Sequence, residues 1–233
     1  MSEAAEKQEP AQPPAEGKNY YRVYPEWLNA IVYFFCRVMV YIVAKLMFRV
    51  EVRGFGNVPP TGAVMIVANH GSHLDPPLCS LVSRRRLSYL AKSDLFEKRS
   101  LGYFISFLGA FPIRRGEGDR GAIKTCINIL KQGKVLLIFP EGTRSPDGTI
   151  QQAKTGVAMI LSQLPDTVIV PVRIDGSFEA WGKNGGKITR KKIILTVGQA
   201  FRVADLGLQS SAKKQLYHDM GREIMSKIMS ASA

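Results

Sequence analysis

The 233-residue chain has few of the residue types that build metal centres and disulfide frameworks. It contains three histidines and three cysteines, Cys36, Cys79 and Cys126. The cysteines are odd in number and widely spaced, and no pair has the spacing of metal ligands. We therefore expect free thiols in a reducing compartment and no structural zinc site.

Acidic residues and nucleophile motifs are also scarce. The 19 Asp and Glu residues face 32 Lys and Arg residues, which gives a formal net charge of +13. Residues 1–19 hold two of the bases and four of the acids, so residues 20–233 carry 30 bases against 15 acids. For a chain this basic we expect anionic partners, such as a lipid surface, phosphorylated ligands or nucleic acid. The absence of any GxSxG sequence excludes the nucleophile elbow of the α/β-hydrolases.

Composition and patterning divide the chain into three segments. Residues 1–19, rich in Ala, Pro, Glu and Gln, are typical of a disordered tail. Residues 20–49 contain an apolar run of 22 residues at 27–48, which is about 33 Å long as a helix and therefore long enough to cross a bilayer. Residues 50–233 are expected to form one globular domain.

The polar residues of the apolar run favour a helix that lies in the membrane interface. Arg37 would lie near the bilayer centre in a spanning helix, at a cost of about 2.5–3.5 kcal/mol. An interfacial helix avoids this cost by turning its polar stripe towards water or towards the globular domain. The alternatives are a buried core helix and a spanning helix, in which Arg49 and Arg53 would place the domain on the cytoplasmic side. The stripe consists of every fourth residue: Asn29, Tyr33, Arg37, Tyr41 and Lys45.

Apolar runs alternate with helical patterns beyond residue 49. This alternation predicts an α/β fold with a mixed, largely parallel central sheet flanked by helices. The expected strands lie at 49–54, 63–69, 87–91, 135–140, 167–174 and 193–201, and the expected helices at 76–84, 101–109, 120–133, 153–164 and from 212 onwards.

The sequence VANHGSHLDPP, residues 67–77, places two histidines and an aspartate after an apolar strand. Asp75, followed by two prolines, predicts the start of a helix with Asp75 as its cap. His70 and Asp75 are five residues apart, so a continuous helix or strand would separate their side chains. Only a turn at Gly71 and Ser72 can bring the carboxylate back to the imidazole.

An imidazole held by a carboxylate is a general base with a fixed tautomer. Ser72 is too close in sequence to His70 to be a nucleophile activated by it. The pair therefore suits direct transfer, in which His70 deprotonates a substrate hydroxyl that attacks an acyl donor. Two alternatives are a helix cap beside two solvated histidines, and His73 as the base, although its two-residue separation from Asp75 is poor for pairing.

The sequence VLLIFPEGTRSPDG, residues 135–148, repeats the layout of an apolar strand followed by a charged turn. Ligands of open α/β sheets bind at the carboxyl ends of strands, so both clusters are expected to face one crevice. Arg144 is suited to bidentate binding of a phosphate.

Four blocks, in this order, resemble the glycerolipid acyltransferases of the 1-acyl-sn-glycerol-3-phosphate (lysophosphatidic acid) acyltransferase family. NHGSHLD resembles the NHxSxxD block of the family, and FPEGTRS its phosphate-site block. LGAFPIRR is similar to the arginine block between them, and VIVPVRIDGS to the final VPV block. With the lead-in VEVRGFGNVP, the resemblance covers residues 50–178.

The resemblance implies two catalytic residues and a phosphate site. His70 takes the proton of the acceptor hydroxyl, and Asp75 orients His70 and stabilises the imidazolium. Within the phosphate site, Arg144 binds the acceptor phosphate and Glu141 organises the surroundings. The phosphate-binding residues implied by the resemblance are Arg144, Glu141, Arg115, Lys92, Gly142 and Thr143.

The resemblance thus predicts an enzyme of phospholipid biosynthesis, a 1-acylglycerol-3-phosphate O-acyltransferase. It would move a fatty acyl chain from acyl-CoA or acyl-carrier protein to the free hydroxyl of 1-acyl-sn-glycerol 3-phosphate, giving phosphatidic acid. The expected partners are the donor, lysophosphatidic acid and a membrane lipid surface, without nucleic acid, metal or other cofactor. The expected location is the cytoplasmic face of the inner (cytoplasmic) membrane. Two alternatives are another lysolipid or lipid amino-acid acceptor, and a non-catalytic protein that binds anionic membranes.

Three further features suggest other functions. GEGDRG, residues 116–121, matches the dinucleotide fingerprint, but the preceding FPIRR, with its proline and two arginines, is not expected to be the required buried strand. The basic stretches at 84–86 and 187–192 suit a nucleic-acid surface, yet few aromatics interleave them. Cys79 is a possible nucleophile near His70, but packing in an apolar helix is the stronger interpretation.

Overall fold

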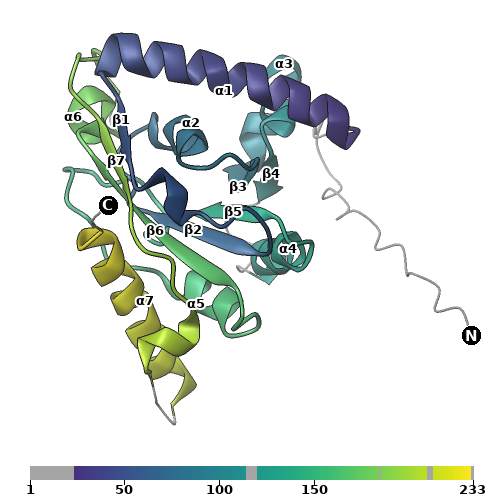
Figure 1. Ribbon diagram of the computed structural model, residues 1–233, viewed down its shortest axis with the longest axis vertical. Helices are drawn as coiled ribbons and strands as arrows, with labels where there is room; N and C mark the ends of the chain where they lie inside the picture. Colours follow the sequence, from purple (N-terminus) through teal and green to yellow (C-terminus); the bar gives the residue numbers. More distant parts are fainter. Residues whose placement is uncertain (1–23, 114–119, 184, 209–211, 232–233) are drawn as a thin grey trace, which may run out of the picture.

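The computed structural model describes residues 24–113, 120–183, 185–208 and 212–231. Within these residues, strands form a single sheet that has helices on both faces (Figure 1). The strands are β1 (Glu51–Arg53), β2 (Val64–Ala68), β3 (Leu87–Lys92), β4 (Ala110–Ile113), β5 (Val135–Ile138), β6 (Val168–Asp175) and β7 (Ile194–Val197). The α-helices are α1 (Glu26–Phe48), α2 (Asp75–Cys79), α3 (Arg99–Phe107), α4 (Arg120–Lys131), α5 (Thr155–Leu161), α6 (Ser177–Trp181) and α7 (Lys213–Met229).

The sheet has the strand order β1-β7-β6-β2-β5-β3-β4. Of the described strand pairs, β6 with β7 is antiparallel and the others are parallel. Every residue of the central strand β2 is buried, because helices cover both faces of a largely parallel sheet. The predicted α/β class with a mixed, largely parallel sheet is confirmed.

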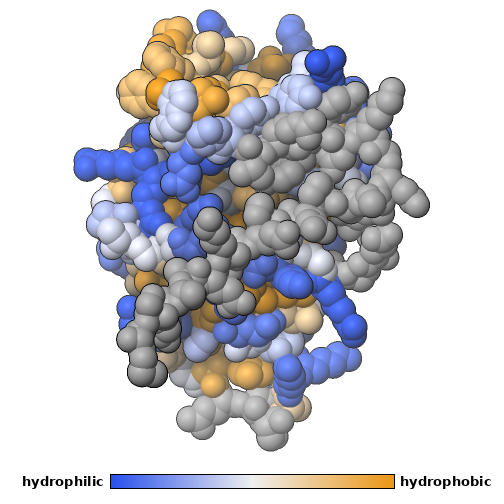
Figure 2. Space-filling model, turned by 90° about the vertical axis from the view of Figure 1, so that its right-hand side faces the viewer, coloured by the Kyte–Doolittle hydropathy of each residue, from blue (hydrophilic) through white to orange (hydrophobic). Residues whose placement is uncertain are grey.

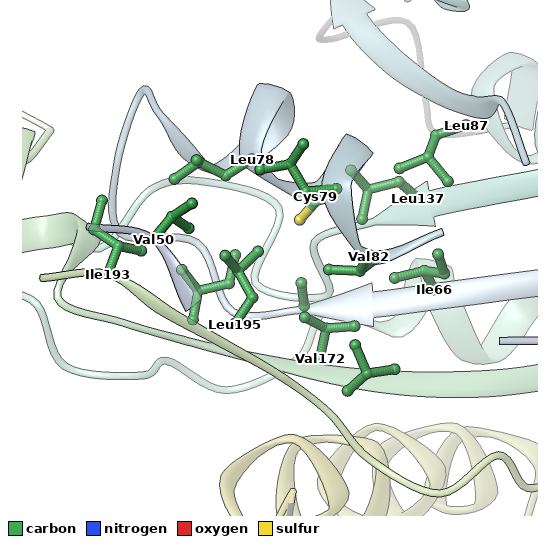
Figure 3. Close-up of a cluster of buried hydrophobic side chains, with 14 of the residues drawn as sticks. Val50, Ile66, Leu78, Cys79, Val82, Leu87, Leu137, Val172, Ile193 and Leu195 are labelled. Carbon is green, nitrogen blue, oxygen red and sulfur yellow. The ribbon is translucent and has the colours of Figure 1, made fainter. Parts of the chain in front are cut away.

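Two apolar cores hold the helices to the sheet. On one face, α2 and the turn after it pack Leu78, Cys79 and Val82 onto sheet residues such as Ile66 and Leu137 (Figure 3). On the other face, α4, α5 and α7 bury their apolar stripes against the same strands. The faces of the sheet are therefore covered by apolar side chains, and the polar side chains of a site are expected in the loops at the ends of the strands.

Two elements differ from the sequence prediction. The stretch before GEGDRG forms the parallel strand β4, so the expectation that its proline argues against a strand is wrong. Pro112 is tolerated because β4 lies at the sheet edge and pairs only with β3. One side of an edge strand has no partner strand, so proline, which lacks an N–H, costs no hydrogen bond on that side. The helix α6, which the sequence did not predict, is five residues long and too short to show a helical period.

Helix α1 lies across the outside of α2 and α3 and turns an apolar face away from the domain (Figures 1 and 2). On its outer face, Trp27, Phe35 and Leu46 are 66%, 64% and 72% exposed. The helix is long and apolar enough to cross a membrane, but only 17% of its most apolar stretch is buried. A buried core helix is therefore the wrong interpretation, and the exposed apolar face is consistent with membrane association.

The inner face of α1 is part of the domain. The hydroxyl oxygen of Tyr33 accepts a hydrogen bond from the Leu87 N–H at 3.3 Å, and Ala44 and Phe48 belong to the core beneath the helix. The polar stripe drifts about 40° with each four-residue step. It therefore begins buried at Asn29, is half-exposed at Arg37 and ends exposed, so that it faces the domain first and the surface later.

The basic stretch at 84–86 is partly structural. Arg85 donates to the carbonyl oxygens of Pro59 and Gly133. Arg86 donates to the carbonyl oxygens of Ser106 and Phe107 at 3.0 and 2.9 Å. Two of the three arginines thus satisfy backbone carbonyls, which weakens the interpretation of this stretch as a nucleic-acid surface.

Candidate active site

The loops that follow β2 and β5 meet at the carboxyl end of the sheet. The two strands are neighbours and run parallel. The backbone N–H of His70, just after β2, donates a hydrogen bond to Oε1 of Glu141, just after β5, at 3.0 Å. This contact confirms the prediction that the two polar clusters face one crevice.

A turn folds Asp75 back onto His70. Oδ2 of Asp75 lies 2.9 Å from Nδ1 of His70 and also accepts hydrogen bonds from the backbone N–H groups of Gly71 and Ser72 at 2.8 and 2.7 Å. The predicted pairing is therefore confirmed. The predicted position of Asp75 as a helix cap is wrong: Leu74 is the N-cap and Asp75 is the first residue of α2. Its buried carboxylate is hydrogen-bonded by the turn instead of by the helix.

The carboxylate sets the tautomer of His70. A carboxylate only accepts hydrogen bonds, so Nδ1 carries the proton and Nε2 keeps its lone pair. The imidazole stacks on Phe139, with ring centroids 3.9 Å apart and 17° between the planes. The His70 side chain is 16% exposed, whereas that of Asp75 is 0% exposed. The imidazole thus reaches solvent with the carboxylate behind it, which is an arrangement that suits a general base.

The loop after β5 holds the backbone of His70 from the other side. The Ser145 N–H donates to the His70 carbonyl at 2.7 Å, so both backbone polar groups of His70 are bound by this loop. The pKa of Glu141 is raised to about 7, mainly by burial. The backbone N–H groups of His70 and Gln151 oppose this rise, and the Asp75 carboxylate adds to it. The observed contact of Glu141 is thus with the turn that carries His70 and Asp75. Its predicted role in a phosphate site stays a prediction.

The other residues of the EGTR turn lie around this contact. Gly142 has φ +67°, and a Cβ there would lie 2.9 Å from Cδ of Lys154, so the turn requires glycine. Thr143 and Arg144 follow and are half-buried.

Arg144 is positioned by a histidine. Its Nη1 contacts Nε2 of His73. The pKa of His73 is lowered, first by partial burial and then by the charge of Arg144, so the ring is neutral and accepts the hydrogen bond. A neutral partner orients a guanidinium without cancelling its charge. Two contacts argue against His73 as the base. Its Nε2 is occupied by Arg144, and the Asp75 carboxylate is bound to His70 instead.

The described contacts do not join Lys92 to the cluster. It is the last residue of β3 and its side chain is exposed. Arg115 lies at 114–119, outside the described residues, together with most of the GEGDRG sequence. The phosphate-binding roles of both residues stay predictions.

Helix α6, which the sequence did not predict, packs against the turn that carries His70 and Asp75. The Ser72 hydroxyl donates to the Trp181 carbonyl at 2.6 Å. Phe178 fits against two site glycines: a Cβ at Gly71 would lie 3.2 Å from its Cβ, and a Cβ at Gly148 only 2.7 Å from its Cδ1. The two glycines are visible in the sequence, but nothing local connects them with Phe178.

A cleft of about 220 Å³ opens beside His70. Its walls include Glu141, Phe178, Thr149 and Arg173, from loops at the same end of the sheet. Arg173 was not among the predicted site residues; its Nε lies 2.9 Å from Oδ1 of Asp175. The cleft is below the roughly 300 Å³ of ordinary small-molecule pockets, so it fits a headgroup better than a whole lipid.

Cys79 does not have the environment of a nucleophile. It is fully buried, and burial, followed by the nearby Asp75 carboxylate, raises the pKa of its thiol well above the usual value. All three cysteines are free thiols, as predicted. Across the part of the chain that the structure describes, no group of three or more His, Cys, Asp or Glu side chains is placed to hold a metal ion.

Comparison with known sequences agrees with this geometry. The acyltransferase family profile matches residues 49–175, more than half of the chain. The chain is 28% identical over 176 residues to the 1-acyl-sn-glycerol-3-phosphate acyltransferase of Bacillus subtilis, covering 75% of this chain and 84% of that protein. It is 30% identical over 144 residues to the Streptococcus pneumoniae protein of the same name, covering 61% of this chain and 51% of that protein. The chain thus spans about half the length of the latter.

Comparison with solved structures supports the fold. The crystal structure of the 1-acyl-sn-glycerophosphate acyltransferase PlsC from Thermotoga maritima matches with a TM-score of 0.70, over 88% of this chain and 81% of that chain. At 24% identity, this likeness bears on the fold alone. The family profile, however, runs from just before β1 to the end of β6 and so contains both polar clusters. The chain therefore belongs to the acyltransferase family.

Proposed function

We propose that the protein transfers a fatty acyl chain from an acyl thioester, on CoA or acyl-carrier protein, to the free hydroxyl of 1-acyl-sn-glycerol 3-phosphate, forming phosphatidic acid. The observation that carries the proposal is the His70–Asp75 pair, 2.9 Å apart, with His70 in the wall of a cleft. The names of the similar Bacillus and Streptococcus proteins suggest the acceptor.

In the proposed reaction, Nε2 of His70 accepts the proton of the acceptor hydroxyl as its oxygen attacks the thioester carbonyl. The tetrahedral intermediate then collapses, the C–S bond breaks, and the leaving thiolate takes the proton from the imidazolium. No protein side chain is acylated. Asp75 orients the ring and stabilises the imidazolium without receiving a proton.

We assign the acceptor phosphate to Arg144. Its planar fork of donors matches a phosphate, and His73 orients it without neutralising it. Glu141, Gly142 and Thr143 would shape the same loop, with Arg115 and Lys92 as further cations of the phosphate site. The net charge of the chain favours an anionic lipid and a phosphate-bearing donor.

Helix α1 would bring this site to a bilayer. Its inner face is packed on the domain through Tyr33 and Phe48, so a spanning orientation would require those contacts to break. We therefore place the helix in the membrane interface, with 20–49 as the membrane-associated segment and 50–233 as the catalytic domain. The predicted tail, 1–19, lies outside the described residues. Free thiols suit a reducing compartment, which favours the cytoplasmic face of the cytoplasmic membrane.

The test is a transfer assay with purified protein, a panel of lysolipid and lipid amino-acid acceptors, and both donor types. Acyl transfer to lysophosphatidic acid is expected. His70→Ala should lower kcat by about 10²- to 10⁴-fold without weakening vesicle binding. His218→Ala, which changes an exposed histidine of α7, is the matched control.

The outcomes separate the candidate functions. Transfer to a different acceptor alone would favour the lysolipid or lipid amino-acid alternative. Vesicle binding without transfer to any acceptor would favour a non-catalytic membrane-binding protein.

A further inference from the structure

A second groove, of about 340 Å³, lies beside α1 and shares no lining residue with the catalytic cleft. One wall is the edge of α1, with Phe34, Arg37 and Tyr41. The other wall is formed by Val52 and Phe55, at and just after β1, with Leu81 below α2 contributing. The lining is apolar apart from Arg37 and the Tyr41 hydroxyl, and no acidic residue is among it.

Arg37 is under-satisfied in this groove. Its Nε is buried and has no hydrogen-bond partner among the described residues. Of the described lining residues, Arg37 is also the one with a charged side chain, so an anion in the groove would meet a positive charge and no acidic competitor. A second cation is close, because the guanidinium carbon of Arg84 lies 5.6 Å from the centroid of the Phe55 ring.

The groove adjoins the exposed apolar face of α1. Phe34 and Tyr41 line the groove and are themselves 59% and 49% exposed, beside the outward-facing Phe35 and Ile42. A bilayer that receives this face would meet the open side of the groove at the depth where acyl chains join headgroups. The volume of the groove lies within the range of small-molecule pockets.

We propose that this groove binds one anionic diacyl phospholipid of the bilayer, with an acyl chain along the apolar wall and the phosphate on Arg37. An apolar lining with a single guanidinium matches a ligand that is apolar along most of its length and anionic at one point. A zwitterionic lipid would bring a cationic headgroup beside Arg37 and Arg84 and is disfavoured. The proposal depends on membrane association and not on the transfer reaction.

The test counts lipids retained by the full chain in a non-ionic detergent, by native mass spectrometry. Phosphatidylglycerol and phosphatidylcholine with the same acyl chains are titrated in parallel. We expect one phosphatidylglycerol to be retained about tenfold more tightly than phosphatidylcholine. Phosphatidic acid should be retained like phosphatidylglycerol, because both are anionic and neither carries the cationic group of phosphatidylcholine. Retention of phosphatidic acid alone would make this a product site and would overturn the assignment to bilayer lipid.

Four variants locate the bound lipid. Arg37→Gln should reduce retention of phosphatidylglycerol to the level of phosphatidylcholine, and Val52→Trp, which fills the groove, should abolish retention of both. Lys45→Gln removes a charge from the same helix outside the groove and should retain the lipid like wild type. His70→Ala should also retain it, because the catalytic cleft is separate.

Unchanged retention in Arg37→Gln, or equal losses in Arg37→Gln and Lys45→Gln, would overturn the proposal. Loss of the lipid in His70→Ala would place it in the catalytic cleft and overturn it as well. Arg37 is half-exposed, so its substitution is compatible with folding and decides the question even where Val52→Trp does not fold.

Discussion

The most informative single substitution is Asp75→Asn, which removes a charge at almost constant size. All three described hydrogen bonds of the Asp75 side chain use one oxygen, Oδ2, so an amide oxygen in the same place can still accept from the N–H groups of Gly71 and Ser72. The amide NH₂ then takes the place of Oδ1, which is buried and has no described hydrogen-bond partner. What disappears is the negative charge beside the imidazolium of the proposed reaction.

The size of the effect follows from that charge. A hydrogen bond to a charged group is worth about 1.5–3 kcal/mol, which corresponds to a loss of about 10- to 150-fold in kcat. Asp75 is fully buried and is not among the residues that line the cleft, so the acceptor KM should change by less than about threefold. If the amide instead turns its NH₂ towards Nδ1 of His70, the ring proton of His70 moves to Nε2, and the loss in kcat approaches about 10⁴-fold.

The assay is steady-state acyl transfer by wild type, Asp75→Asn and Asp166→Asn, with thermal melting by circular dichroism. Asp166 is an exposed aspartate and controls for the change in net charge. A variant that melts like wild type and keeps kcat within about threefold would refute the role given to Asp75. A rise in KM alone would refute it too, because it would make Asp75 a substrate contact.

Three further predictions concern the phosphate site, the buried Glu141 and the outer face of α1. Arg144→Gln should raise the acceptor KM by about 10- to 100-fold and change kcat little, since a phosphate contact exists throughout binding; an unchanged KM would remove Arg144 from the phosphate site. Glu141 has a pKa of about 7 in the folded protein against an ordinary 4.5, so the folded state holds its proton in a range where the unfolded state has released it. The stability of wild type relative to Glu141→Gln should therefore fall by about 2–3 kcal/mol between pH 5 and pH 8 in denaturant titrations, and a flat difference would contradict the buried carboxyl. Replacing both Phe35 and Leu46 with Glu should abolish sedimentation with vesicles while the melting temperature stays near that of wild type; unchanged sedimentation would show that α1 is not the membrane contact.

The sequence was sufficient to predict those features of the site that depend on residues close together in the chain. The apolar run of β2, the turn at Gly71 and Ser72 and the prolines after Asp75 together predict that the carboxylate returns to the imidazole, and the structure has that contact. The polar turn after β5 was found in the same way. Both arise from strand and turn chemistry within about ten residues.

Other features could not be predicted from neighbouring residues alone. Pro112 argues against a strand until the position of β4 at the sheet edge is known. The drift of the α1 stripe from buried Asn29 to exposed Lys45 depends on how the helix crosses the domain. The groove beside Arg37 exists only because Val52 and Leu81 are brought next to α1 from two other segments.

The sequence by itself determined which residues could perform acid–base chemistry and that a turn at Gly71 and Ser72 could bring Asp75 back to His70. Only the tertiary structure decided that Glu141, 71 residues further on, binds the backbone of His70, and that Phe178 and Trp181 pack against the same turn. The physical reason is range: turn and strand preferences act between near neighbours in the chain, whereas strand order and loop contacts are set by how the sheet and its helices bury their apolar faces together.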